Sequence, residues 1–214
     1  MSQTSVTFPS GEALIELEGI LHLPGGHGPF PACVICHPYP PAGGSMEVPV
    51  VATVANALAQ AGVAALRFNF RGVGASTGAF DDGQGEVDDV VGALDWLSAQ
   101  SEVNPDRLAL VGYSFGAVMA LFNAARDDQA RPLVLIGIPL RWNLPLPDLY
   151  HSDCLLLAGE IDQFCPLSEL RAFAQQQEGV VKVDVIAGAD HFLFGYESEV
   201  ANAVVGFLRE TLSR

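Results

Sequence analysis

Residues 108–116 read LALVGYSFG, a short apolar run followed by Gly112-Tyr113-Ser114-Phe115-Gly116, which matches the pattern Gly-x-Ser-x-Gly. The apolar run is typical of a buried strand, and the residues after it have the apolar spacing of a helix. A strand, a tight turn and a helix form the context in which this pattern exposes a nucleophilic serine. We therefore expect the Ser114 hydroxyl at the carboxyl edge of a sheet, where open α/β sheets place their sites. In the alternative interpretation, Ser114 only caps its helix.

The same alternation of strand and helix patterns extends over the chain. Continuous apolar runs predict buried strands at residues 32–36, 63–70, 108–112, 133–138, 154–158 and 181–186, with helical patterns between them. Residues 5–8 and 14–23 are typical of an antiparallel hairpin at the sheet edge. The pattern predicts an α/β fold with an open, mostly parallel sheet of about eight strands and helices on both faces. We expect one such domain over residues 1–214.

Residues 141–150 lie between the expected strands 133–138 and 154–158. Pro139, Pro145 and Pro147 bracket or interrupt this segment, so a long helix is not expected. Ten residues are also too few for a lid domain, which predicts an open site.

The composition excludes several classes of partner. The chain has 214 residues and a formal net charge of −15, which disfavours nucleic acid and acidic membrane surfaces. No apolar run approaches the roughly 20 residues that span a bilayer, and we see no signal peptide. Four cysteines are compatible with a reducing compartment, so we expect a cytoplasmic protein. Cys33 and Cys36 fall on one expected strand, where residues three apart face opposite sides, so we expect neither a metal site nor a disulfide there.

A serine nucleophile needs a base and an acid, which in this fold follow it in the order acid, then histidine. His191 lies just after the expected strand 181–186, on a loop at the correct sheet edge. Asp162 lies just after the strand 154–158 and is the expected acid. Glu160 and Asp190 are the competing acids.

An oxyanion hole requires backbone N–H groups directed at the developing charge. The first donor is expected at Phe115, directly after the nucleophile, and the second on the loop 37–41 after the first parallel strand. Prolines have no N–H, which leaves His37 or Tyr39, and Tyr39 is preferred because it lies further out on the loop. In the alternative interpretation, this proline-rich loop is a rigid turn without a catalytic role.

Several motifs together resemble those of the α/β-hydrolase superfamily. They are His37-Pro38-Tyr39-Pro40, the segments 43–46 and 67–76, the serine turn, the segment 159–162 and Asp190-His191-Phe192. The chain is most similar to small lidless hydrolases related to dienelactone hydrolases and X-prolyl-dipeptidase-like proteins. Such relatives often have histidine where Tyr39 stands, and dienelactone hydrolases use cysteine where Ser114 stands. The resemblance implies that residues 69–76 shape a loop beside the site, where Arg71 either binds a carboxylate or braces the loop.

These residues predict a serine hydrolase that cleaves a small carboxylic ester through an acyl-enzyme, without a metal or other cofactor. Thioesterase, amidase, peptidase or acyltransferase activity on the same triad stays open, as does a non-catalytic binding protein. The expected pocket is small and apolar, and its walls are Tyr39, Met46, Phe115, Trp142, Phe164 and Phe192. We expect a small-molecule substrate, and a homodimer is compatible with such a site.

Overall fold

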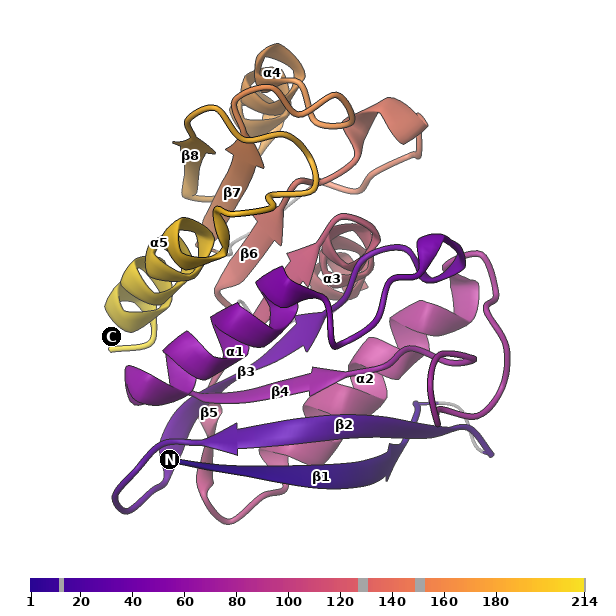
Figure 1. The fold of residues 1–214 in the computed structure, drawn as a ribbon, viewed down its shortest axis with the longest axis vertical. Coiled ribbons are helices and arrows are strands. Elements are labelled where there is room, and N and C mark those ends of the chain that lie inside the picture. The colour runs from indigo at the N-terminus through magenta and orange to yellow at the C-terminus, as the bar shows by residue number, and fades with distance from the viewer. Residues whose placement is uncertain (12–13, 127–130, 149–152, 214) are drawn as a thin grey trace.

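The computed structural model describes residues 1–11, 14–126, 131–148 and 153–213. Eight strands form one sheet in the order β1-β2-β4-β3-β5-β6-β7-β8 (Figure 1). The strands are β1 (Ser2–Pro9), β2 (Glu16–Leu23), β3 (Phe30–Cys36), β4 (Ala64–Phe68), β5 (Val103–Tyr113), β6 (Leu133–Ile136), β7 (Cys154–Gly159) and β8 (Val181–Ile186). β2 is antiparallel to β1 and β4, and the other neighbouring strands are parallel. The predicted α/β class and mostly parallel eight-stranded sheet are confirmed.

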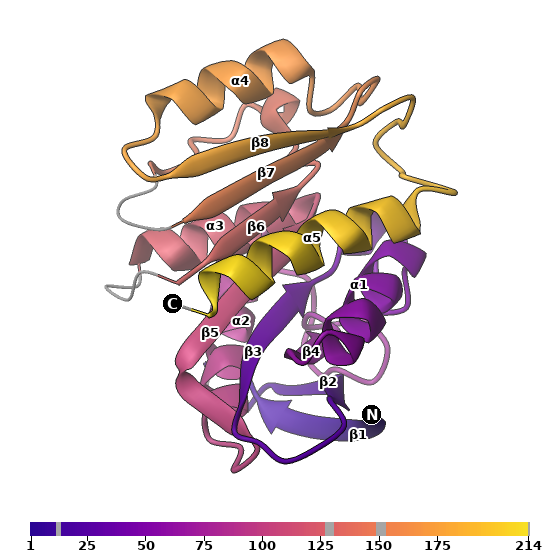
Figure 2. The ribbon, with the colours of Figure 1, turned by 90° about the vertical axis from the view of Figure 1, so that its left-hand side faces the viewer.

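Helices cover both faces of the sheet. They are α1 (Pro49–Gln60), α2 (Gln84–Ser98), α3 (Phe115–Arg126), α4 (Leu167–Gln176) and α5 (Glu197–Thr211). α1 and α5 lie side by side over one face, and α2, α3 and α4 pack on the other (Figures 1 and 2). The parallel strands are therefore buried on both sides, which explains their continuous apolar sequences.

β3 shows how one strand supplies both apolar cores. Val34 and Cys36 pack into the core beneath α2 and α3, whereas Cys33 and Ile35 pack into the core beneath α1 and α5. Cys33 and Cys36 thus face opposite sides of the sheet, as expected from the period of two residues along a strand. Each fully buried side chain of the size of Ile35 stabilises the fold by about 2 kcal/mol relative to an exposed one.

Residues near the helix ends explain where several helices begin or end. α1 begins at Pro49 and is followed by Gly62, whose φ of 88° lies in the left-handed region that favours glycine. The carboxylate of Glu86 accepts a hydrogen bond from the N–H of Gly83, the residue before α2. α5 begins at Glu197, and the N–H of Val200 donates to the carbonyl of Tyr196.

The segment after β6 is short and irregular. A single 3-10 turn, η2 (Leu140–Trp142), is the only helical element in its described part, residues 137–148, and residues 149–150 of the expected segment lie outside the described residues. The N–H of Arg141 donates to the carbonyl of Phe164 at 3.2 Å, which fixes the turn beside the loop after β7. No lid covers the sheet edge here in the described chain. Among the described helices, none has the length and apolar character required to cross a membrane.

Candidate active site

Ser114 lies in the turn between β5 and α3. Its φ of 54° is in the left-handed region, and its N–H donates to the carbonyl of Ile136 at 2.8 Å. A Cβ on Gly112 would collide with the backbone of Gly116, and one on Gly116 would collide with that of Cys36. The glycines of the motif are therefore required for the close backbone approach that gives the turn its strained shape.

The three side chains expected as nucleophile, base and acid form one hydrogen-bonded line. Ser114 Oγ lies 3.0 Å from His191 Nε2, and His191 Nδ1 lies 2.8 Å from Asp162 Oδ2. All three residues are buried, although they come from loops after β5, β7 and β8. Because Nδ1 faces a carboxylate, it carries the proton, and Nε2 is free to accept the serine proton.

Asp162 is held in place by the backbone of its own loop. Its Oδ1 accepts hydrogen bonds from the N–H groups of Phe164 and Cys165, each at 2.8 Å. The competing acids face elsewhere, since Glu160 accepts from Gly188 N–H and Asp190 accepts from Phe192 N–H. The structure thus brings only Asp162 of the three to His191.

Two hydrogen bonds to backbone carbonyls hold the loop that carries His191 in place. The hydroxyl of Tyr113 donates to the carbonyl of His191 at 2.8 Å, and the N–H of Ile161 donates to the carbonyl of Ala189 at 3.0 Å. Burial raises the pKa of Tyr113 well above its usual range, so this donor keeps its proton at any physiological pH. The ring of Phe164 packs edge-on against the imidazole, with centroids 4.8 Å apart.

The side chains of Tyr39 and Phe115, the two residues expected to supply the oxyanion donors, pack close to each other. The rings of Tyr39 and Phe115 have centroids 5.7 Å apart, and in the described chain neither residue's N–H donates to another backbone group. The His37 side chain is occupied elsewhere: Nδ1 donates to the carbonyl of Pro38 at 2.6 Å, and Nε2 accepts the N–H of Phe70 at 3.1 Å. Burial lowers the pKa of His37 to about 4 and keeps it neutral. Sequence reasoning missed this bracing role, because it depends on a contact with a loop 33 residues away.

A cavity of about 570 Å³ opens onto Ser114 and His191. Four of the expected wall residues line it, namely Tyr39, Trp142, Phe164 and Phe192, whereas Phe115 lines a neighbouring cavity. The prediction that Met46 forms part of the pocket wall is wrong, because Met46 lines neither cavity. Its N–H donates to Asn69 Oδ1 and its carbonyl accepts from Arg67, which hold it in a buried position behind the loop.

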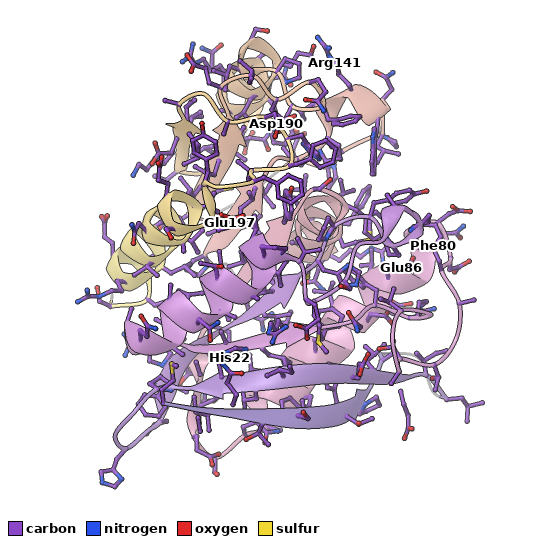
Figure 3. All side chains as sticks on the ribbon, viewed as in Figure 1. His22, Phe80, Glu86, Arg141, Asp190 and Glu197 are labelled. Carbon is purple, nitrogen blue, oxygen red and sulfur yellow. The ribbon has the colours of Figure 1, made fainter. Side chains whose placement is uncertain are left out.

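The lining residues that were not anticipated include Phe194 and Glu197. Phe194 stacks on Phe192 with an interplanar angle of 14°, and its position two residues later in the same loop was an available signal. Glu197 lies in the first turn of α5, near the loop that carries Asp190 (Figure 3). It is the only Asp or Glu among the residues lining this cavity in the described chain.

The buried polar residues after β4 brace the neighbouring loops. Arg71 is buried and pairs with buried Asp89 of α2 at 2.8 Å, which favours the bracing role over binding of a substrate carboxylate. Asn69 bridges Met46 and Glu18. In the described part of the chain, no three His, Cys, Asp or Glu side chains are placed to hold a metal ion.

Comparisons with known proteins agree with this architecture. The sequence model of the X-Pro dipeptidyl-peptidase (S15) family matches residues 15–143. An uncharacterized protein of Rickettsia prowazekii is 33% identical over 178 residues, which cover 79% of this chain and 74% of that protein.

Two solved structures are also similar over nearly their whole length. An alpha-beta serine hydrolase homologue from Coxiella burnetii superposes with a TM-score of 0.84 at 32% identity, covering 96% of this chain and 97% of that one. A Xanthomonas campestris protein described as an α/β serine hydrolase without a lid has a TM-score of 0.87 at 28% identity, covering 100% and 97%. The resemblance seen in the sequence motifs is confirmed, and the chain belongs to the X-Pro dipeptidyl-peptidase (S15) family, with the fold of the lidless α/β serine hydrolases.

Proposed function

We propose that this hydrolase cleaves a small carboxylic ester through an acyl-enzyme. Ser114 Oγ attacks the ester carbonyl carbon while His191 Nε2 takes the serine proton, and Asp162 stabilises the imidazolium. The N–H groups of Tyr39 and Phe115 bind the oxyanion. His191 then protonates the leaving alcohol, and the serine ester remains. A water molecule, deprotonated by His191, releases the acid and regenerates Ser114.

The observation that carries this proposal is the hydrogen-bonded line from Ser114 through His191 to Asp162 at the mouth of a cavity. A serine that only capped its helix would not require an imidazole nitrogen at 3.0 Å from its hydroxyl, on a ring oriented in turn by a buried carboxylate. The same line argues against a non-catalytic binding protein.

The cavity supports a small substrate. It is lined mainly by apolar and aromatic side chains, and the described residues include no lid that would enclose a long chain. We therefore propose that acyl groups from acetyl to butyryl are preferred.

A fluorophosphonate probe and a series of p-nitrophenyl esters test the proposal. The probe should label the wild type and not Ser114→Ala, and kcat/KM should be highest from acetyl to butyryl without activation by emulsion droplets. Labelling of Ser114→Ala at the wild-type rate would contradict the nucleophile assignment. A preference for long acyl chains would contradict the substrate class.

A second candidate function is cleavage after an X-Pro dipeptide, and the match to the family of that name favours it. The matched residues 15–143 include Ser114 but neither Asp162 nor His191. An Ala-Pro p-nitroanilide, assayed beside p-nitrophenyl acetate, separates the two. Higher kcat/KM on the anilide would replace the esterase proposal.

A further inference from the structure

A second cavity adjoins the cavity of Ser114. It measures about 690 Å³ and lies against α2 and α3, where Val87, Val118, Met119 and Phe122 line it. Tyr39 and Trp142 line both cavities, so their side chains form the wall between them. We call the two spaces the serine cavity and the second cavity.

The wall is a packed aromatic contact. The rings of Tyr39 and Trp142 meet edge to face with centroids 5.2 Å apart, and Tyr39 also packs against Phe80 at 5.5 Å. Both wall residues sit on hydrogen-bonded backbone: the carbonyl of Tyr39 accepts the N–H groups of Ala42 and Gly44, and the N–H of Trp142 donates to the carbonyl of Pro139. Figure 3 shows Phe80 on the loop before α2. The wall is therefore a fixed part of the site.

The position of the wall relates it to one side of the reaction. His191 must face the leaving group, because it protonates the departing oxygen, and it lines only the serine cavity. Phe115, whose N–H is a proposed oxyanion donor, lines only the second cavity. The leaving group lies on the His191 side of Ser114, so the acyl group extends the other way within the serine cavity, whose lining includes Tyr39 and Trp142.

We propose that the contact between Tyr39 and Trp142 sets the upper limit on acyl length, and that the second cavity is an acyl-chain subsite which this contact closes. This inference rests on the proposed function. The residues beyond the wall are mostly apolar, so the group that would enter is a linear alkyl chain. Each methylene that enters should improve reactivity by about fourfold, the factor that corresponds to the transfer free energy of a buried methylene.

The test uses p-nitrophenyl alkylphosphonates with methyl, butyl and octyl chains, which report on the cavity whether the natural substrate is an ester or a peptide. The measured quantity is the ratio of the second-order rate constants of inactivation, octyl over methyl. Trp142→Ala should raise this ratio at least about tenfold, the gain expected from two or more newly buried methylenes. Trp96→Ala is the matched control, because Trp96 stacks on Phe8 of β1 and lines neither cavity.

A second substitution tests whether the chain enters the second cavity. Gln84 is exposed and lines that cavity, so Gln84→Trp should obstruct it without disturbing the core. In Trp142→Ala, adding Gln84→Trp should return the ratio toward the wild-type value. If Trp142→Ala does not fold, judged by circular dichroism, Trp142→Leu opens the wall with a smaller loss of volume.

The outcomes separate the two proposals. An unchanged ratio in a folded wall variant that the methyl probe still labels would overturn the acyl-length inference and leave the serine nucleophile intact. A raised ratio that Gln84→Trp does not reduce would show that the chain leaves by another route, and would also overturn it. Failure of every probe to label the wild type would overturn the proposed function itself, and the inference with it.

Discussion

The Nε2 atom of His37 accepts a hydrogen bond from the backbone N–H of Phe70 at 3.1 Å, which joins the loop after β3 to the chain after β4. The bond requires a neutral ring, because Nδ1 donates to Pro38 at the same time. The loop that supplies the proposed oxyanion donor is therefore held by a histidine that must not be protonated.

This histidine predicts a loss of stability in acid. Burial lowers the pKa of His37 from 6.5 to about 4 in the folded chain. As pH falls, His37 takes up its proton in the unfolded chain before it does so in the folded chain. This residue therefore has no effect on the free energy of unfolding above about pH 6.5. Between about pH 6.5 and about pH 4 it lowers the free energy of unfolding by about 3 kcal/mol. Urea unfolding at several pH values measures this slope. His37→Gln should be less stable at neutral pH yet show a shallower slope, and an unchanged slope would contradict the prediction.

His22 should contribute in the same direction, since burial first and Arg67 second lower its pKa to about 4. Its Nε2 accepts a hydrogen bond from Arg67 Nε at 3.0 Å, which also requires a neutral ring. We expect His22→Gln to reduce the slope independently of His37→Gln. If the two substitutions together leave the slope as steep as in the wild type, other groups control acid unfolding.

Substitutions in the hydrogen-bonded line should act as one unit. Ser114→Ala, His191→Ala and Asp162→Asn should each lower kcat by at least about 10³-fold without loss of fold, because each interrupts the same proton transfer. The double variant Ser114→Ala with His191→Ala should be little worse than either single one. Steady-state kinetics check this, and additive losses would mean that the two residues act separately.

Glu197 should disfavour substrates that carry a negative charge. It is the only carboxylate of Asp or Glu that lines the serine cavity among the described residues. Glu197→Gln should raise kcat/KM for an ester with a carboxylate in its alcohol part by about three- to tenfold at low salt, and less at high salt. Glu199→Gln is the control, because Glu199 lies in the same helix turn but does not line the cavity. If both substitutions raise kcat/KM equally, the effect comes from the change in net charge and not from the position of Glu197 in the cavity.

The buried pair of Arg71 and Asp89 should be required for stability. Asp89→Asn keeps the shape of the side chain but removes the buried carboxylate that pairs with the guanidinium of Arg71, which should cost about 3 kcal/mol. Asp88→Asn, at the neighbouring and less buried position, should change the free energy of unfolding by less than about 0.5 kcal/mol. Chemical denaturation measures both, and similar losses would contradict the role of the pair.

The sheet could be predicted because its parallel strands are buried on both faces, so that apolar runs mark them directly. β5 is longer than its apolar run, and its start at Val103 was missed because residues 104–107 are polar or proline. Val103 belongs to the sheet through pairing with Phe30, a partner that no local pattern identifies.

For the candidate site, the sequence could predict which three residues meet at the edge of the sheet. Each of Ser114, Asp162 and His191 follows a strand, and parallel strands end at one edge, so local patterns bring them together. The side-chain environment could not be predicted in this way. The wall between the two cavities joins Tyr39 to Trp142, and Arg71 finds Asp89 on another element. Such contacts depend on packing between distant segments, as does the burial of Met46.

Because Cys33 and Cys36 face opposite sides of β3, their thiols can report separately on the two helical layers that cover the sheet. Both thiols are fully buried, and burial raises their pKa values well above the usual range, so neither presents a reactive thiolate in the folded chain. Cys33 becomes accessible only when the layer of α1 and α5 separates from the sheet, and Cys36 only when the layer of α2 and α3 does. Rates of alkylation at two positions three residues apart would thus time the detachment of each helical layer separately.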